Sequence, residues 1–176
     1  RCGRPAGGRV MFSLPSFVMG RQFILLTLLV LVLDQLTKSW ALSALFVTGQ
    51  QIVITPFFNL TPVWNSGISF GLLADFPSVT GLGIPVFALL VVAWLYLQLS
   101  QLDAVQRFGA GFIAGGALGN VIDRLRFERV IDFIDLHLLG YHWPAFNIAD
   151  SAIFIGVVAW LYGIMSAPKS EGVTHE

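Results

Sequence analysis

Long, mostly apolar segments are the feature of this sequence that most restricts the fold it can adopt. A helix needs about 20 mostly apolar residues to cross a bilayer. Four segments meet or nearly meet this requirement, at residues 23–46, 80–99, 108–122 and 148–165. The whole chain is 56% hydrophobic and only 11% charged, whereas a soluble domain carries about 25% charged residues. The sequence therefore predicts an all-α membrane protein with four transmembrane helices.

The two ends of the sequence differ in composition from the rest. Residues 1–20 contain three arginines and are expected to be a leader or a disordered N-terminus. Residues 167–176 are polar and are expected to form a disordered cytoplasmic tail. Residues 21–166 between them are expected to form one four-helix membrane domain.

Basic residues indicate the orientation of these helices. Four spans place both termini on one side of the membrane, and Lys and Arg concentrate on that side, which is typical of the cytoplasm. The basic residues are Arg1, Arg4, Arg9, Arg21, Arg107 and Lys169 on that side, and Arg124, Arg126 and Arg129 on the other. Residues 47–79 and 123–146 are therefore expected outside. A weak strand pattern at residues 51–55 predicts a small extracytoplasmic β platform between helices one and two.

Polar residues inside the predicted spans are candidates for function, because a charged side chain is costly in lipid. Asp34 and Lys38 are four residues apart, which places them on one helix face in the favourable order for an ion pair. Gly111, Gly115 and Gly119 recur at every fourth position of the third span. Such a stripe of small residues is typical of a close helix contact.

The connection before the last span carries carboxylates among apolar neighbours. Asp150 is either a cap at the start of the last helix or a partner of Asp132. Gly140 and Pro144 turn the chain between the two aspartates, so a hairpin here brings them together. Two adjacent carboxylates share one proton, and one then activates water while the other donates to the scissile carbonyl. The pattern indicates an aspartic peptidase that needs no metal or other cofactor.

Serine chemistry is the main enzymatic alternative. Residues 67–71 match the G-x-S-x-G string of a nucleophile elbow, but that motif requires a strand-turn-helix context that a short membrane chain lacks. A Ser–Lys arrangement would use Ser69 or Ser66 with Lys38, the only lysine within a predicted span. Burial could lower the pKa of such a lysine and make it a base.

Other classes of protein fit less well. His137 and His142 with Asp135 are an alternative metal-binding set, although their spacing suits one helix face poorly. A transporter needs polar groups near the bilayer midplane of several spans, whereas the second span here has none. A structural assembly subunit would account for the glycines and not for the aspartates. The net charge of zero provides no basic surface for nucleic acid.

At these positions the sequence resembles the bacterial lipoprotein signal peptidases, also called signal peptidase II. Five blocks carry the resemblance in the family's order, at residues 34–38, 65–71, 115–124, 130–133 and 144–151. The resemblance implies four helices and a small extracytoplasmic β platform. It also implies a multi-pass enzyme of the bacterial inner membrane, which removes signal peptides from prolipoproteins by cleaving before a diacylglyceryl-modified cysteine.

The resemblance also implies roles for individual residues. The catalytic pair falls on Asp132 and Asp150, with no metal. The positions that match the family's substrate-binding or bracing residues are Asp34, Lys38, Asn65, Gly116, Asn120, Arg124 and Asn147. The implied partners are lipid-modified prolipoproteins and membrane lipids, and the protein is expected to be a monomer.

Overall fold

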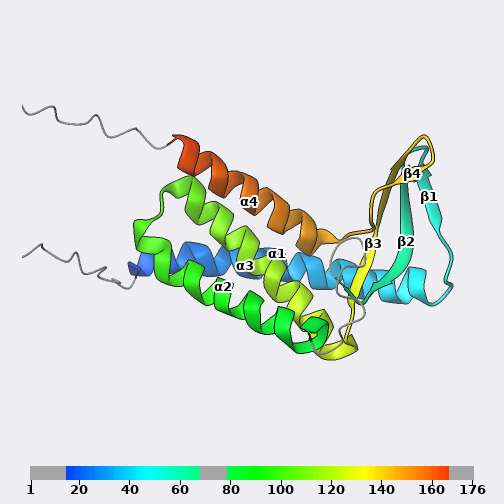
Figure 1. Ribbon diagram of the computed structural model, residues 1–176, viewed down its shortest axis with the longest axis horizontal. Helices are drawn as coiled ribbons and strands as arrows, with labels where there is room; N and C mark the ends of the chain where they lie inside the picture. Colours follow the sequence, from blue (N-terminus) through cyan, green and yellow to red (C-terminus); the bar gives the residue numbers. More distant parts are fainter. Residues whose placement is uncertain (1–14, 68–78, 167–176) are drawn as a thin grey trace, which may run out of the picture.

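The structure, a computed structural model, describes residues 15–67 and 79–166. Four α-helices run along its long axis, and a small sheet lies at one end of them (Figure 1). The helices are α1 (Phe17–Ala41), α2 (Ile84–Gln98), α3 (Ala104–Phe127) and α4 (Ile148–Ser166), with short π or 3-10 turns at Leu42–Phe46, Val79–Gly83 and Leu99–Gln101. α1 begins and α4 ends at the end of the bundle opposite the sheet (Figure 1).

Three helices in the described part of the chain are long and apolar enough to cross a membrane: Phe17–Phe46, Val79–Gln101 and Ile148–Ser166. α3 is not among them. It has 24 residues, which gives a length of about 36 Å, but its many glycines, Asn120 and the charged residues near its ends lower its hydropathy. The structure therefore supports three of the four predicted spans by composition.

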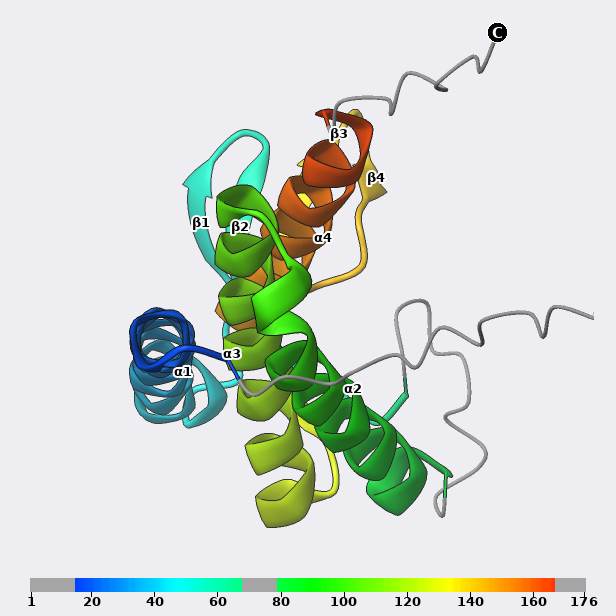
Figure 2. The ribbon, with the colours of Figure 1, turned by 90° about the vertical axis from the view of Figure 1, so that its left-hand side faces the viewer.

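α3 lies between the other helices when the bundle is viewed from the end opposite the sheet (Figure 2). Its predicted glycine stripe faces α1, where a Cβ added to Gly115 would lie 2.6 Å from Cβ of Val30. Gly116 faces α4 instead, and a Cβ there would lie 2.3 Å from the carbonyl oxygen of Ala149. Because real side chains do not tolerate such distances, these glycines allow α3 to contact both neighbours closely. The predicted packing role is confirmed.

The sheet has four antiparallel strands in the order β1-β2-β3-β4. They are β1 (Ile52–Thr55), β2 (Phe58–Asn65), β3 (Val130–Leu138) and β4 (Tyr141–His142). The prediction that the platform lies between helices one and two was therefore wrong for half of it, since β3 and β4 follow α3. A two-stranded hairpin is marginal alone, and β3 completes the sheet by pairing Val63 with Asp132 and Asn65 with Val130. This pairing brings Asp132 to the end of the helix bundle.

Candidate active site

Asp132 lies in β3 and is 1% exposed. Its Oδ1 accepts a hydrogen bond of 2.7 Å from Nδ2 of Asn147, and its Oδ2 accepts one of 2.9 Å from Nδ2 of Asn65. Asn65 is the last residue of β2, and Asn147 directly precedes α4. The carboxylate is therefore held at the junction of the sheet and the helices.

Asp150 lies in the first turn of α4. Its Oδ1 accepts from Nδ2 of Asn120 at 2.7 Å, and its Oδ2 accepts from the backbone N of Asn147 at 3.3 Å. Oδ1 of Asn147 in turn accepts from the backbone N of Asp150 at 2.9 Å. This reciprocal pair is a capping box in which Asn147 is the cap residue. One oxygen of Asp150 is therefore left to face Asn120.

Asn147 joins the two aspartates. Its side chain donates to Asp132 and its backbone donates to Asp150. The pKa of Asp132 is raised from 3.8 to about 7, first by burial and then by the negative charge of Asp150, while hydrogen bonds from Asn65 and Asn147 oppose this shift. The carboxyl group therefore titrates near neutral pH, as a shared-proton pair requires.

Lys38 and three polar side chains form a buried cluster below the pair. Nζ of Lys38 lies 2.9 Å from Oδ2 of Asp34 and 2.7 Å from Oδ2 of Asp123, and it donates to Oδ1 of Asn120 at 2.9 Å. The predicted pair of Asp34 and Lys38 is confirmed. Because Asn120 accepts from Lys38 and donates to Asp150, the cluster orients the amide that contacts Asp150.

Asp34 also fixes the start of α4. Its Oδ1 accepts from the backbone N of Ala149 at 2.9 Å. A Cβ added to Gly119 would lie 2.3 Å from Oδ2 of Asp34, so only glycine leaves room for this carboxylate. Nε2 of Gln35 donates to both Asp34 and Asp123. Gln35 and Asp123 fall in two of the matching blocks, at residues 34–38 and 115–124, but the sequence alone predicted no role for either.

Arg124 connects α3 to the end of β2. Its Nη2 donates to the carbonyl oxygen of Gly67 at 3.1 Å, and its Nη1 donates to that of Asn120 at 3.5 Å. The backbone N of Gly67 donates to Oδ1 of Asn65 at 3.0 Å. Arg124 therefore supports the segment that presents Asn65 to Asp132. Gly116, by contrast, packs against the backbone of Ala149.

A cavity of about 800 Å³ opens beside Asp150. Its polar wall contains Asn65, Asn120 and Arg124 together with Asp150. Most of its remaining lining is apolar and comes from α2, α4 and the segment between β4 and α4, including Ile84, Trp143, Phe146 and Phe154. An apolar cavity with a few convergent polar groups is typical of a ligand site.

Of the serine alternative, the structure describes Lys38 and Ser66, and Lys38 makes its polar contacts with other residues. The three N–H donors of Lys38 are directed at Asp34, Asp123 and Asn120. The ammonium is thus held between two carboxylates, an arrangement that does not suit a general base. Ser66 is exposed, and Ser69 lies outside the described residues.

His137 and His142 lie in the outer part of the sheet. Nδ1 of His142 is 2.7 Å from Oδ1 of Asp135, and the rings of His137 and His142 stack at 4.7 Å. Oδ2 of Asp135 accepts from Asn59 at 3.1 Å and from Thr61 at 3.2 Å. Burial alone would raise the pKa of Asp135, but its hydrogen bonds, with His142 first, hold it below the ordinary value. These contacts connect β4 to β2 through β3.

The chain is similar to known proteins over most of its length. The family described as signal peptidase (SPase) II matches residues 26–166. Proteins named lipoprotein signal peptidase are similar in sequence. The one from Desulforapulum autotrophicum is 43% identical over 145 residues, which cover 80% of this chain and 90% of the relative. The one from Syntrophotalea carbinolica is 38% identical over 162 residues, covering 89% and 96%.

Solved structures show the same fold. A bacterial membrane enzyme determined by the in meso method at 2.3 Å resolution superimposes with a TM-score of 0.72 and 28% identity, covering 87% of this chain and 94% of that one. A second, at 1.9 Å resolution, has a TM-score of 0.70 and 29% identity, covering 84% and 95%. On the family match and these relatives, the chain belongs to the signal peptidase II family.

Proposed function

We propose that this membrane protease, from a family that removes signal peptides from prolipoproteins, is an aspartic endopeptidase whose catalytic residues are Asp132 and Asp150. The observation that carries the proposal is the position of Asn147, which donates to both carboxylates and so holds them at one site. The raised pKa of Asp132 supports a pair that retains one proton near neutral pH.

The reaction needs one ionised and one protonated carboxyl group. The ionised group takes a proton from water as the water oxygen attacks the scissile carbonyl carbon, and the protonated group donates its proton to the carbonyl oxygen. The resulting diol then collapses as its C–N bond breaks. The leaving nitrogen takes the proton that came from water, one diol hydroxyl gives its proton to the other carboxylate as the C=O bond forms, and the pair returns to its starting state. Asp132 itself is 1% exposed, and its burial limits the access of bulk water and strengthens these interactions.

The proposed substrate is a prolipoprotein cleaved before a diacylglyceryl-modified cysteine. The cavity beside Asp150 supports this assignment, because its apolar walls suit acyl chains while Asn65, Asn120 and Arg124 suit a peptide backbone. Asp34, Lys38, Asn147 and Gly116 are proposed to brace the site rather than to touch substrate. Their contacts with α4, Asn120 and Asp132 support that role.

We further propose that α3 is the fourth span and that both termini are cytoplasmic, in the bacterial inner membrane. α3 runs beside three helices that are apolar enough to span a membrane. The start of α1 and the end of α4 both lie at the end of the bundle opposite the sheet (Figure 1). The aspartate pair then lies at the extracytoplasmic interface, where the lipid-anchored end of a prolipoprotein would present its scissile bond. The enzyme is proposed to act as a monomer.

The direct test uses purified protein and one prolipoprotein in two forms, with and without the diacylglyceryl group. We expect cleavage of the lipidated form, with the new N-terminus at the modified cysteine as read by mass spectrometry. The unlipidated form should remain intact. Equal cleavage of both forms would contradict the proposed substrate class. It would not bear on the aspartic mechanism, which the substitutions of Asp132 and Asp150 test separately.

A further inference from the structure

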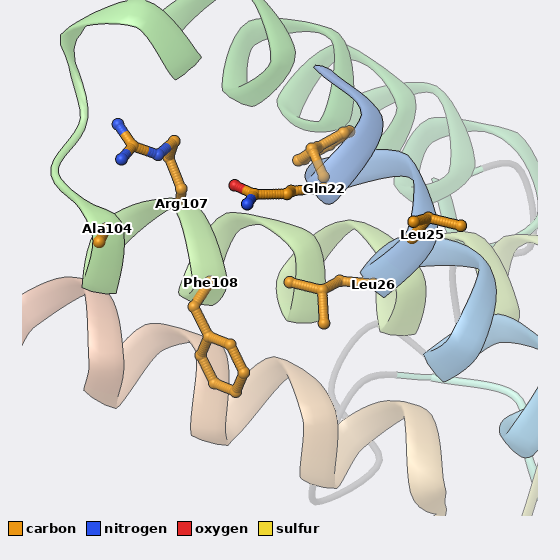
Figure 3. A pocket seen from close by; sticks show the side chains of 7 residues that line it. Gln22, Leu25, Leu26, Ala104, Arg107 and Phe108 are labelled. Carbon is orange, nitrogen blue, oxygen red and sulfur yellow. The ribbon is translucent and has the colours of Figure 1, made fainter. Parts of the chain in front are cut away.

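A second cavity, of about 420 Å³, lies between the second and third turns of α1 and the first turn of α3, at the end of the bundle opposite the aspartates. Its walls are apolar and include Phe23, Leu25, Leu26 and Phe108. Its polar lining residues are Gln22 and Arg107 (Figure 3). None of these residues contributes to the peptidase site.

The cavity exists because the spacing between α1 and α3 changes along their length. At Gly111 the helices are in contact, since an added Cβ would lie 2.8 Å from Cβ of Leu26, and Oγ1 of Thr27 donates to the carbonyl oxygen of Gly111 at 3.4 Å. One turn earlier, α3 carries Arg107 and Phe108 in place of a glycine facing α1. The helices do not close up here as they do at Gly111, and a space opens at the surface, where Phe108 is 41% exposed.

The rim of this cavity is basic. In Figure 3 the Gln22 side chain extends from α1 toward α3, and the Arg107 guanidinium lies at the edge of the space. One guanidinium nitrogen donates to the carbonyl oxygen of Leu102, and a guanidinium has five N–H donors. The nearby carboxylate of Asp103 is turned toward α4, where its Oδ2 would lie 3.0 Å from a Cβ on Gly163. An anion at the rim therefore meets Arg107 rather than Asp103.

We propose that this cavity binds one anionic phospholipid, with its phosphate at Arg107 and Gln22 and an acyl chain against Leu25, Leu26 and Phe108. Basic pockets between transmembrane helices on the cytoplasmic side bind anionic headgroups, and the volume is within the range of ligand sites. The leaflet follows from the proposed orientation, in which this end is cytoplasmic. The binding itself does not depend on peptidase activity.

Native mass spectrometry of the purified full chain in detergent tests the proposal. The probes are phosphatidylglycerol and phosphatidylcholine with identical acyl chains. We expect the wild-type protein to retain phosphatidylglycerol preferentially, and Arg107→Gln to weaken that retention about fivefold, as expected for one basic residue at a lipid headgroup. The matched control is Arg129→Gln, at an exposed arginine near the sheet, which should bind as the wild type does.

A second variant tests whether the cavity itself is needed, independently of the charge of Arg107. Ala104 also lines the cavity and is exposed, so Ala104→Trp fills the space and leaves Arg107 intact. It should lower the retention of either lipid, and excess inorganic phosphate should not displace phosphatidylglycerol from the wild-type protein. The proposal is overturned if Arg107→Gln retains phosphatidylglycerol as the wild type does, if Ala104→Trp has no effect, or if phosphate displaces the lipid. Prolipoprotein cleavage, measured in the same preparations, should persist in both variants.

Discussion

The side-chain amide of Asn147 donates a 2.7 Å hydrogen bond to the carboxylate of Asp132 and thereby ties β3 to the first turn of α4. The same residue caps α4 and exchanges hydrogen bonds with Asp150. One asparagine thus sets the position of both carboxyl groups.

Replacing Asn147 by Ala should impair both catalysis and stability. Loss of a cap residue costs about 1 kcal/mol, and the two carboxyl groups lose their shared donor, so kcat should fall by at least about tenfold. Thermal unfolding and steady-state cleavage assays measure the two effects. Asn59→Ala, at an asparagine in the sheet that contacts Asp135 instead, is the control and should keep normal kcat. An Asn147→Ala enzyme with normal kcat would show that the bridge is dispensable.

Lys38→Met should destabilise the protein strongly. The change leaves Asp34 and Asp123 buried without their cation, and breaking a buried ion pair costs about 3–5 kcal/mol. Arg129→Met, at an exposed position, is the control and should unfold as the wild type does. If Lys38→Met were as stable as the wild type and yet inactive, lysine would be acting in the chemistry and the serine alternative would be favoured.

Activity should decline as the pH rises through about 7. Asp132 holds its proton below that pH, and a pair with both groups ionised has no proton to donate to the carbonyl oxygen. The hydrogen bond from Asn65 stabilises the ionised form, so Asn65→Ala should move the alkaline limb of kcat/KM to higher pH. A pH–rate series on both proteins measures this, and a shift to lower pH would be inconsistent with the proposed role of Asn65.

Asp135 should stabilise the sheet only while it is ionised. Its pKa is held below the ordinary value, so the stabilisation is complete above that value and is lost as the pH falls through the lower pKa of the folded protein. The wild type should therefore be more stable than Asp135→Asn at pH 6, with the difference shrinking toward pH 3. Thermal unfolding across this range measures it. A difference that grows on acidification would contradict the assignment.

Much of the site was predictable because its residues break the apolar pattern of a membrane chain. Asp34 and Lys38 stand four apart in a span, and the structure pairs them. Asp132 and Asp150 stand out among apolar neighbours in the same way, and the structure gives them a common partner. A buried charge needs a partner, so the sequence alone indicates that these charged residues meet polar partners in the folded protein.

Other features depend on contacts between segments distant in the sequence, so the local sequence pattern does not predict them. The place of Asp123 beside Lys38 follows from the packing of α3 on α1, which brings together residues 85 positions apart. Likewise β3 joins β2 only because α3 returns the chain to the sheet. The expectation of a platform confined to the first connection failed for this reason. The role of Asn147 as the cap was missed because Asp150 is an equally good cap residue by type.

The most direct test of the aspartic mechanism is the cleavage rate of Asp132→Asn, Asp150→Asn and the double variant on a lipidated prolipoprotein, with folding checked by thermal unfolding. Each single change removes acid–base function at nearly constant size, so kcat should fall by at least about 100-fold. The double change should cost little more than either single change, because the two groups act as one unit. Ser69→Ala should cleave normally. A folded Asp132→Asn enzyme that cleaves at the wild-type rate would contradict the account.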